Sequence, residues 1–427
     1  MWRRWLIYIV LFFSVIVIHA GCEEKPVKYQ NTFIQALEDK PPEPDDTLLV
    51  WTTKDIFTGT TDYFFEHETT LKLKVEVINQ AEVIDRFYEA LTYKRPPDLF
   101  LLPDEFVGLF SEIDGFVDFN SYLNDHGIYH DLPRALMDRY VNLENKRYGV
   151  PVTFFPYVTY YRHDILDSFG FPSEPEALAQ FIEKQGNYFT LAKVLSEDNL
   201  YIFESNQALV QLGLRTSYPF SSDYSYQYTA GSFLQVTEAV ALLYLANLQP
   251  GISIWSDHGQ WLLENDQLVM FQMPSYGADH LKQWVPEQKG NWRMTDLPFG
   301  LSGMDREGSL VALMSEKSHY KETAFALLQA MTRDQNYHIF HESSHPMLDQ
   351  EHLTLYYNRL LSKEAEGRPS MLDLYARRHW HNTMFDINKG VPLTPLLFEK
   401  THDRLQEEIK LDQRILIEQF VNGTQEN

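Results

Sequence analysis

The sequence predicts an α/β fold, because short apolar runs alternate with segments of helical periodicity. Between residues 48 and 102 the order reads strand, helix, strand, helix, strand, which is typical of a layer built on a parallel sheet. The first and third runs, Leu48–Trp51 and Asp98–Leu102, are apolar along almost their whole length, as in strands buried on both faces. The chain has 427 residues and is 44% hydrophobic, enough for two domains with full cores.

The second strand of this layer is expected at 72–77, where polar and apolar residues alternate. Helical spacing follows from 82 to 91, and Pro96-Pro97 ends it before the third strand. Sheets of this kind bind ligands beyond the carboxyl ends of their strands. Trp51 and Asp104 fall at such ends.

The middle of the chain predicts a crossing segment. Residues 148–157 read as extended and proline-interrupted, and they continue into a strand at 158–161. Asp164-Ile165-Leu166 opens a short helix that Gly170 and Pro172 close. Ser173 and Glu176 have the spacing of a capping box for the next helix.

The second half alternates in the same way. Residues 233–248 form an amphipathic helix with one apolar face, made of Phe233, Val236, Val240 and Leu243. The elements expected after it are a helix at 260–264, a strand at 268–271, a turn at 297–300 and a buried strand at 310–314. Ser318 is expected to cap a helix whose buried stripe is Ala324, Leu327, Leu328 and Met331, and residues 396–420 read as helical.

The chain begins with a secretory leader. Its basic start contains Arg3 and Arg4, and an apolar run then continues to Ile18. The small residues Ala20-Gly21 come next, directly before Cys22, the only cysteine of the sequence. Ala20-Gly21-Cys22 resembles the lipobox of bacterial lipoproteins, although His19 departs from the aliphatic residue usual there. The resemblance implies a lipidated Cys22 that ties the protein to a membrane surface. The alternative is a plain secretory signal or an uncleaved anchor with an incidental cysteine. Residues 23–46 read as a tether that is polar and rich in proline.

Charge excludes some partners. There are 60 acidic and 36 basic residues, a formal net charge of -24, which repels nucleic acid and anionic lipid surfaces. The sequence contains no glycine-rich phosphate loop, no internal repeat and no second apolar run long enough to span a bilayer.

The order of these pieces resembles the extracellular solute-binding proteins of ABC importers, family 1, and within it the maltose-binding-protein-like branch. The residues that carry the resemblance are Trp51-Thr52, Pro97-Asp98-Leu99, Tyr148-Gly149-Val150-Pro151, Tyr160-Tyr161-Arg162-His163-Asp164, Leu268-Val269-Met270, Leu297-Pro298-Phe299-Gly300 and Gly308-Ser309. They span essentially all of the chain beyond the leader.

The resemblance implies a two-lobed periplasmic-binding-protein type II fold, with hinge strands between the lobes and a helical C-terminal region. It places lobe 1 at 47–155 with a return segment at about 305–345, and lobe 2 at 156–304 with helices at about 346–427. It also implies a monomer without cofactor or catalytic activity. Such a protein captures a carbohydrate, an oligosaccharide in this branch, and delivers it to the permease subunits.

A sugar offers apolar C–H faces that stack on aromatic rings and hydroxyls that need hydrogen bonds. The chain is 14% aromatic, and most of these rings must serve as core. The resemblance implies that Trp51 and Asp104 line the first lobe of the cleft, and that Phe155 stands where related proteins carry a hinge carboxylate. In the second lobe it implies an aromatic platform at Tyr276, which Trp255 and Asp257 complete. For each aromatic residue the alternative is core packing.

Enzymatic alternatives rest on weaker signals. His341-Glu342-Ser343-Ser344-His345 matches the HExxH pattern of zinc peptidases, but Ser343-Ser344 and Pro346 disfavour the required helix. His379-Trp380-His381 reads as polar surface or a wall of the second lobe. A glycosidase needs two facing carboxylates, which Asp98, Asp104 and Asp257 could supply if they converge. A receptor for a peptide, polyamine or metal chelate remains a further alternative.

Overall fold

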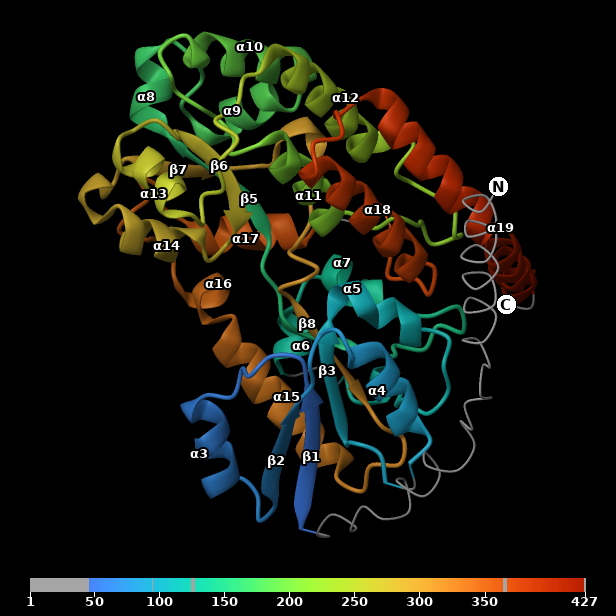
Figure 1. Cartoon of the computed structure of the whole chain (residues 1–427). Coiled ribbons are helices and arrows are strands. Elements are labelled where there is room, and N and C mark those ends of the chain that lie inside the picture. The colour runs from blue at the N-terminus through green and yellow to red at the C-terminus, as the bar shows by residue number, and fades with distance from the viewer. Residues whose placement is uncertain (1–45, 94, 124–126, 364–366, 426–427) are drawn as a thin grey trace, which may run out of the picture. The chain divides into compact units, whose positions relative to one another are not determined.

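The structure is a computed structural model of the chain. It describes residues 46–93, 95–123, 127–363 and 367–425. The predicted leader, Cys22 and all of the predicted tether except Asp46 lie outside the described residues. The described part folds into two lobes, each built on one sheet (Figure 1).

The larger sheet has the strand order β2-β1-β3-β8-β4. Its strands are β1 (Thr47–Thr52), β2 (Lys72–Val77), β3 (Leu99–Pro103), β4 (Val150–Thr153) and β8 (Leu310–Met314). β1 pairs in parallel with β2 and β3, as predicted, whereas β8 runs antiparallel to β3 and β4. The sheet is therefore mixed, because β8 returns from the second lobe in the opposite direction.

The smaller sheet has the order β6-β5-β7, and both of its strand pairs are antiparallel. Its strands are β5 (Tyr157–Arg162), β6 (Met270–Pro274) and β7 (Trp292–Thr295). Neighbouring residues of β5 face opposite sides, since Tyr160 packs into one hydrophobic cluster and Tyr161 into another. Helices cover both faces, which explains why all six residues of β5 are buried.

Helices of the first lobe flank the larger sheet (Figure 1). They are α3 (Gly59–His67), α4 (Val83–Leu91), α5 (Asp104–Val107), α6 (Ile128–Asp131), α7 (Arg134–Met137) and α15 (Lys321–Gln335), with the 3-10 turns η1 (Gly108–Phe110), η2 (Phe119–Ser121) and η3 (Asp138–Tyr140). α15 packs on α3 and β4 through the predicted stripe, which is buried as expected.

Helices of the second lobe surround the smaller sheet (Figure 1). They are α8 (His163–Ser168), α9 (Pro175–Ile182), α10 (Gln185–Ser196), α11 (Asn206–Thr216), α12 (Gly231–Ala246), α13 (Asp257–Glu264) and α14 (Gly277–Trp284), with η4 (Pro286–Gln288) and η5 (Pro298–Gly300). The predicted apolar face of α12 is fully buried and packs against α11.

The C-terminal part is helical, as predicted. It comprises α16 (Tyr337–His341), α17 (Leu353–Leu361), α18 (Asp373–Asn388) and α19 (Pro395–Gln425). α18 packs on α19 and also contacts α5 and η1 of the first lobe. This helix therefore touches elements of both lobes. Among the described residues, no helix is both long and apolar enough to cross a membrane.

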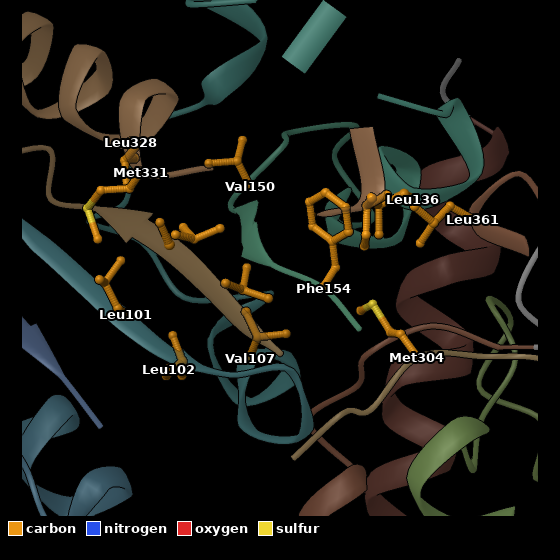
Figure 2. Close-up of a cluster of buried hydrophobic side chains, with 14 of the residues drawn as sticks. Leu101, Leu102, Val107, Leu136, Val150, Phe154, Met304, Leu328, Met331 and Leu361 are labelled. Atoms are coloured by element: carbon orange, nitrogen blue, oxygen red, sulfur yellow. The ribbon is translucent and has the colours of Figure 1, made fainter. Parts of the chain in front are cut away.

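Two chain segments cross between the sheets side by side, where Pro156 forms an isolated bridge with Met304. The hydrophobic core continues through this crossing. Figure 2 shows Phe154 and Met304 beside Leu361, in one cluster with Leu101, Leu102 and Val150 of the larger sheet. The hinge is therefore packed with apolar side chains on this side.

Two predicted helix caps are wrong. α9 begins at Pro175 with Glu174 as its N-cap, and the Ser173 hydroxyl instead donates to Asp167 Oδ1 at 3.4 Å. α15 begins at Lys321 with Tyr320 as its N-cap. Ser318 lies before the helix, where its hydroxyl donates to Asp98 Oδ1 at 2.6 Å and accepts the Tyr320 N–H at 3.1 Å, a local turn rather than a helix cap.

Candidate functional site

The parallel strands of the larger sheet end at one edge and place polar side chains there. Lys54 follows β1, Gln80 follows β2 and Glu105 follows β3. The amide of Gln80 donates to Glu105 Oε1 at 3.1 Å. Lys54 Nζ donates to the carbonyl oxygens of Glu307 and Gly308 at 3.0 and 3.3 Å. The strand ends thus face the second crossing segment, as expected for a ligand site of this sheet type.

A cavity of about 390 Å³ lies at this edge, within the size range of small-molecule sites. Its walls come from the strand ends, from α11, from the crossing segment before β8 and from α18. The lining residues are Gln80, Glu105, Gln211, Leu214, Arg215, Pro219, Tyr228, Arg306, Glu307, Asp373, Ala376, Arg377, Trp380, His381 and Met384. The cavity wall therefore combines apolar side chains with charged groups of both signs.

The positive charge of Arg215, in the last turn of α11, is neutralised by Glu307 within the site. Its guanidinium lies 2.5 Å from Glu307 Oε2 and donates to the Tyr157 hydroxyl at 3.3 Å. These contacts join α11 of the second lobe to the crossing segment and to the first residue of β5.

Asp305 is buried in the crossing segment, with 3% of its surface exposed. Its backbone N–H donates to the Phe155 carbonyl at 2.8 Å. Burial raises the pKa of its carboxyl, and the positive charge of Arg215 opposes that rise. Asp305 in turn raises the pKa of Tyr276, second to the effect of burial. The carboxyl therefore lies in the electrostatic neighbourhood of both residues.

A row of aromatic and imidazole rings leads away from the hinge, and we call Phe155, Tyr276, His280, Trp255 and Trp284 the aromatic row. Phe155 meets Tyr276 at 5.3 Å between ring centroids, and Tyr276 meets His280 at 5.7 Å. His280 contacts both Trp255 at 5.0 Å and Trp284 at 4.9 Å. Trp255 is 57% exposed, and the other four rings are half-buried. The row is therefore accessible along its length.

A buried polar cluster closes the other side of the cavity, and we call Asp104, Tyr140, Tyr218, Arg306 and Asp373 the buried bridge. Asp104 accepts hydrogen bonds from Tyr140 at 2.9 Å, from Tyr218 at 3.0 Å and from Arg306 Nε at 3.0 Å. Arg306 also donates to Asp373 Oδ2 at 2.7 Å. Burial raises the pKa of Asp373 to about 7, although Arg306 opposes the shift.

Two predicted site residues are enclosed by protein contacts. Trp51 is 1% exposed, and its ring packs against Phe87 and Phe100 in the first lobe. β1 continues one residue further, to Thr52, so Trp51 lies within the sheet face rather than beyond the strand end. Asp104 is 0% exposed and belongs to the buried bridge. We therefore omit both from the proposed ligand contacts.

The other four predicted residues lie in the second lobe or at the hinge. Phe155, Trp255 and Tyr276 are brought together in the aromatic row. Asp257 is exposed and is the first residue of α13, next to the Ser256 N-cap.

The structure bears on the enzymatic alternatives as well. α16 ends at His341 and Glu342 is extended, so the two histidines of the HExxH pattern do not share a helix. Throughout the described ranges no group of three metal-ligating side chains is assembled. His379 contacts Glu408 on α19 at 2.7 Å, and Trp380 is buried. Asp98 and Asp104 flank β3 at opposite ends and do not face each other.

Sequence reasoning missed the charged residues of the cavity, above all Arg215, Asp305, Arg306 and Asp373. The sequence next to two of these residues, Asp305 and Arg306, does indicate an unusual site. Asp305-Arg306-Glu307 places three consecutive charges two residues before the fully apolar strand β8. Such a run is unusual in a buried crossing segment unless the charges are paired.

The chain matches known proteins in sequence family and in fold. A family model described as bacterial extracellular solute-binding protein matches residues 64–346, more than half of the chain. No curated protein sequence gives a significant match.

Solved structures share the fold at low identity. The sugar-binding protein MalE from Xanthomonas citri is 15% identical with a TM-score of 0.67, and the match covers 87% of this chain and 99% of that one. The galacto-N-biose-/lacto-N-biose I-binding protein of the ABC transporter from Bifidobacterium longum, solved with lacto-N-biose, is 12% identical with a TM-score of 0.63, and the match covers 87% and 99%. The ABC transporter associated binding protein from B. animalis subsp. lactis Bl-04, solved with beta-1,6-galactobiose, is 14% identical with a TM-score of 0.58, over 86% and 98%. These matches confirm the predicted two-lobed fold.

Proposed function

Because the chain belongs to the family of bacterial extracellular solute-binding proteins, we propose that it captures a carbohydrate between its lobes and delivers it to an ABC permease. The carbohydrate class is proposed to be an oligosaccharide. The protein binds the sugar without making or breaking bonds.

The aromatic row is the observation that carries this proposal. Half-exposed rings offer flat apolar faces to the C–H surfaces of a sugar. The row begins at the hinge with Phe155 and Tyr276 and ends at the exposed Trp255. Beside it, the cavity supplies carboxylate, amide and guanidinium groups for the sugar hydroxyls. A ligand that needs both kinds of contact is accommodated where the two meet, near Tyr276 and Arg215.

The structural neighbours support the same ligand class, since they are a sugar-binding protein and complexes with lacto-N-biose and beta-1,6-galactobiose. We further assign 47–155 with about 305–345 to lobe 1, and 156–304 with about 346–427 to lobe 2. A sugar that contacts both lobes favours the closed arrangement by its differential affinity alone.

We also propose that Cys22 carries lipid and holds the protein at the outer face of a membrane. A Cys22→Ser variant, expressed in the bacterium, should move from the membrane fraction to the soluble fraction. Its mature mass should lack the diacylglycerol that the wild-type chain carries. A variant that stays in the membrane with an intact leader would instead identify an uncleaved anchor.

The sugar proposal is tested by thermal shift with the full chain in detergent. The probes are maltotriose, lacto-N-biose and beta-1,6-galactobiose, and the controls are added zinc and a chelator. One sugar should raise the melting temperature in proportion to the logarithm of its concentration, while zinc and chelator leave it unchanged.

Tyr276→Ala should remove the sugar-dependent shift, because the ring stands at the junction of the aromatic row and the cavity. Trp261→Ala is the matched control, since Trp261 is 45% exposed on α13 and contacts His258 outside the row. Loss of the shift in both variants, or in neither, would reject the site.

A further inference from the structure

The last helix, α19, has 31 residues and lies at the outer edge of the described part (Figure 1). One side of it packs on the protein through Leu405, Ile409 and Leu416, which share a hydrophobic cluster with residues of α18 and of the segment after α11. Its packing is therefore one-sided, and the opposite side is available for a contact.

That opposite side is exposed, and we call six of its residues the outward face: Arg404, Glu407, Leu411, Arg414, Ile415 and Glu418. At 3.6 residues per turn, all six lie within about 60° of Leu411 around the helix axis. Leu411 is 65% exposed and Ile415 is 46% exposed. Because these two residues are one helical turn apart, their side chains form one apolar patch.

Charged side chains flank the apolar patch on both sides. Arg404 and Glu407 precede it, and Arg414 and Glu418 follow its first residue. Within the ranges that the structure describes, none of these four charges forms an ion pair. By contrast, Glu408, which is turned toward α18, contacts His379 at 2.7 Å. The charges of the outward face are therefore free to meet a partner.

The order of these charges is self-complementary about Leu411. Arg404 comes seven residues before Leu411 and Glu418 comes seven residues after it. An antiparallel second copy, with Leu411 facing Leu411, therefore sets Arg404 opposite Glu418 at both ends of the contact. Glu407 and Arg414 face each other to within one residue, since they stand four before and three after Leu411. A parallel copy would instead set each charge against its own kind.

We propose that the outward face of α19 is a dimerisation surface and that its occupant is a second copy of this chain, paired antiparallel about a two-fold axis at Leu411. Each contact then occurs twice, as closed two-fold symmetry requires. The apolar patches cover each other, and the opposite charges fix orientation and register. Because the packed side of α19 points away from the contact, the two protein bodies lie on opposite sides of the helix pair.

This inference goes beyond the function proposed above and does not depend on it, and it departs from the monomer that the resemblance implies. The contact is short, so we expect a weak dimer, since interfaces below ~1,200 Å² are typical of transient complexes. Attachment of both copies to one membrane through lipidated Cys22 would raise their effective concentration without any new contact.

Sedimentation equilibrium of the full chain in density-matched detergent, across the micromolar range, tests the inference. The protein mass of wild type should rise toward that of a dimer with concentration. Leu411→Lys should stay monomeric, because it brings two ammonium groups together at the two-fold axis. Both proteins should have the same melting temperature, since Leu411 is 65% exposed, which separates lost pairing from lost folding.

A charge swap tests the register. Arg404→Glu places two acidic side chains opposite each other at both ends and should weaken dimerisation by about tenfold or more. Arg404→Glu combined with Glu418→Arg restores opposite charges and should dimerise like wild type. Arg134→Glu is the matched control, since Arg134 is exposed on α7, and it should leave dimerisation unchanged.

Three results would overturn the inference. A wild-type chain that stays monomeric at every concentration has no such interface. A dimer that persists in Leu411→Lys and in Arg404→Glu uses another surface. A charge swap that fails to restore dimerisation rejects the antiparallel register and the proposed interface with it. Sugar affinity reports separately on the proposed function, because no residue of the outward face lines the cavity.

Discussion

The Tyr218 hydroxyl donates to the carboxylate of Asp104 and lies 3.0 Å from each of its oxygens. Asp104 follows β3 in the larger sheet, whereas Tyr218 follows α11 beside the smaller one. Arg306 stacks on the Tyr218 ring at 4.1 Å while it pairs with the same carboxylate. The buried bridge thus ties the two halves of the structure together beside the cavity.

Asp104→Asn should destabilise the folded chain strongly. The change removes one of the two carboxylates that neutralise Arg306, a side chain that is only 5% exposed. Leaving a buried charge incompletely paired costs about 3 kcal/mol or more. Urea denaturation followed by circular dichroism should show the lower midpoint. Asp198→Asn, at an exposed position on the turn after α10, is the matched surface control, and an equal midpoint for both variants would contradict a structural role of Asp104.

Gly303→Ala should lower stability because the segment around Gly303 passes very close to the backbone of the last residue of α11. An added Cβ would lie 1.9 Å from the Thr216 carbonyl oxygen, so one of the two backbones must move. Overpacking of this kind costs about 1–3 kcal/mol. Gly186→Ala, in α10 with no atom within 4 Å of the new Cβ, should be neutral or slightly stabilising. Thermal unfolding of the two variants checks the prediction, and a similar melting temperature for both would refute the close approach.

Trp51→Ala should reduce stability and leave sugar affinity unchanged in the folded protein. Trp51 is 1% exposed and packs in the core of the first lobe, where truncation of a large aromatic side chain costs about 3–5 kcal/mol. Thermal unfolding and calorimetric titration at low temperature separate the two effects. A weaker affinity with unchanged stability would restore Trp51 to the ligand site.

Stability should fall in acid partly through His402. Burial lowers the pKa of this imidazole to about 4, and its Nδ1 lies 2.9 Å from the Tyr226 hydroxyl. Between pH 6.5 and pH 4 the unfolded chain therefore binds a proton that the folded chain does not, so the free energy of unfolding decreases as pH falls through this window. The loss is on the order of 3 kcal/mol.

His402→Asn should flatten this dependence when urea midpoints are compared from pH 4 to pH 7. Asp373 acts in the opposite sense, because its pKa is raised to about 7 and its contribution to stability decreases as pH rises from 4 to 7. The difference between wild type and the His402 variant isolates the histidine. An NMR titration that gives His402 an ordinary pKa would contradict the prediction.

The pattern of apolar and polar residues predicted strands well where burial either alternates or is continuous along the strand. The strand expected at 72–77 is β2, and the strand expected at 310–314 is β8, with the same boundaries. The strand expected at 268–271 lies two residues later, at Met270–Pro274, because Leu268 bridges to Tyr201 instead. Periodicity and apolar runs are properties of neighbouring residues, so one sequence is enough to read them.

The site could be predicted only in part. Phe155, Tyr276 and Trp255 lie together as the resemblance implied for a ligand wall. The buried bridge was not predicted, because its members lie at positions 104, 140, 218, 306 and 373. Nothing in the residues next to any one of them indicates the others.

From the order of its residues alone, this chain determined an α/β architecture and an extended, proline-interrupted crossing segment at 148–157, because both depend on short-range pattern. The tertiary structure decided which donors each buried polar group meets. Asp104 accepts hydrogen bonds from Tyr140, Tyr218 and Arg306, while Oδ1 of Asp305 meets no donor among the described residues. A carboxylate has the same chemistry in both places, and the donors brought to it by distant segments set its role.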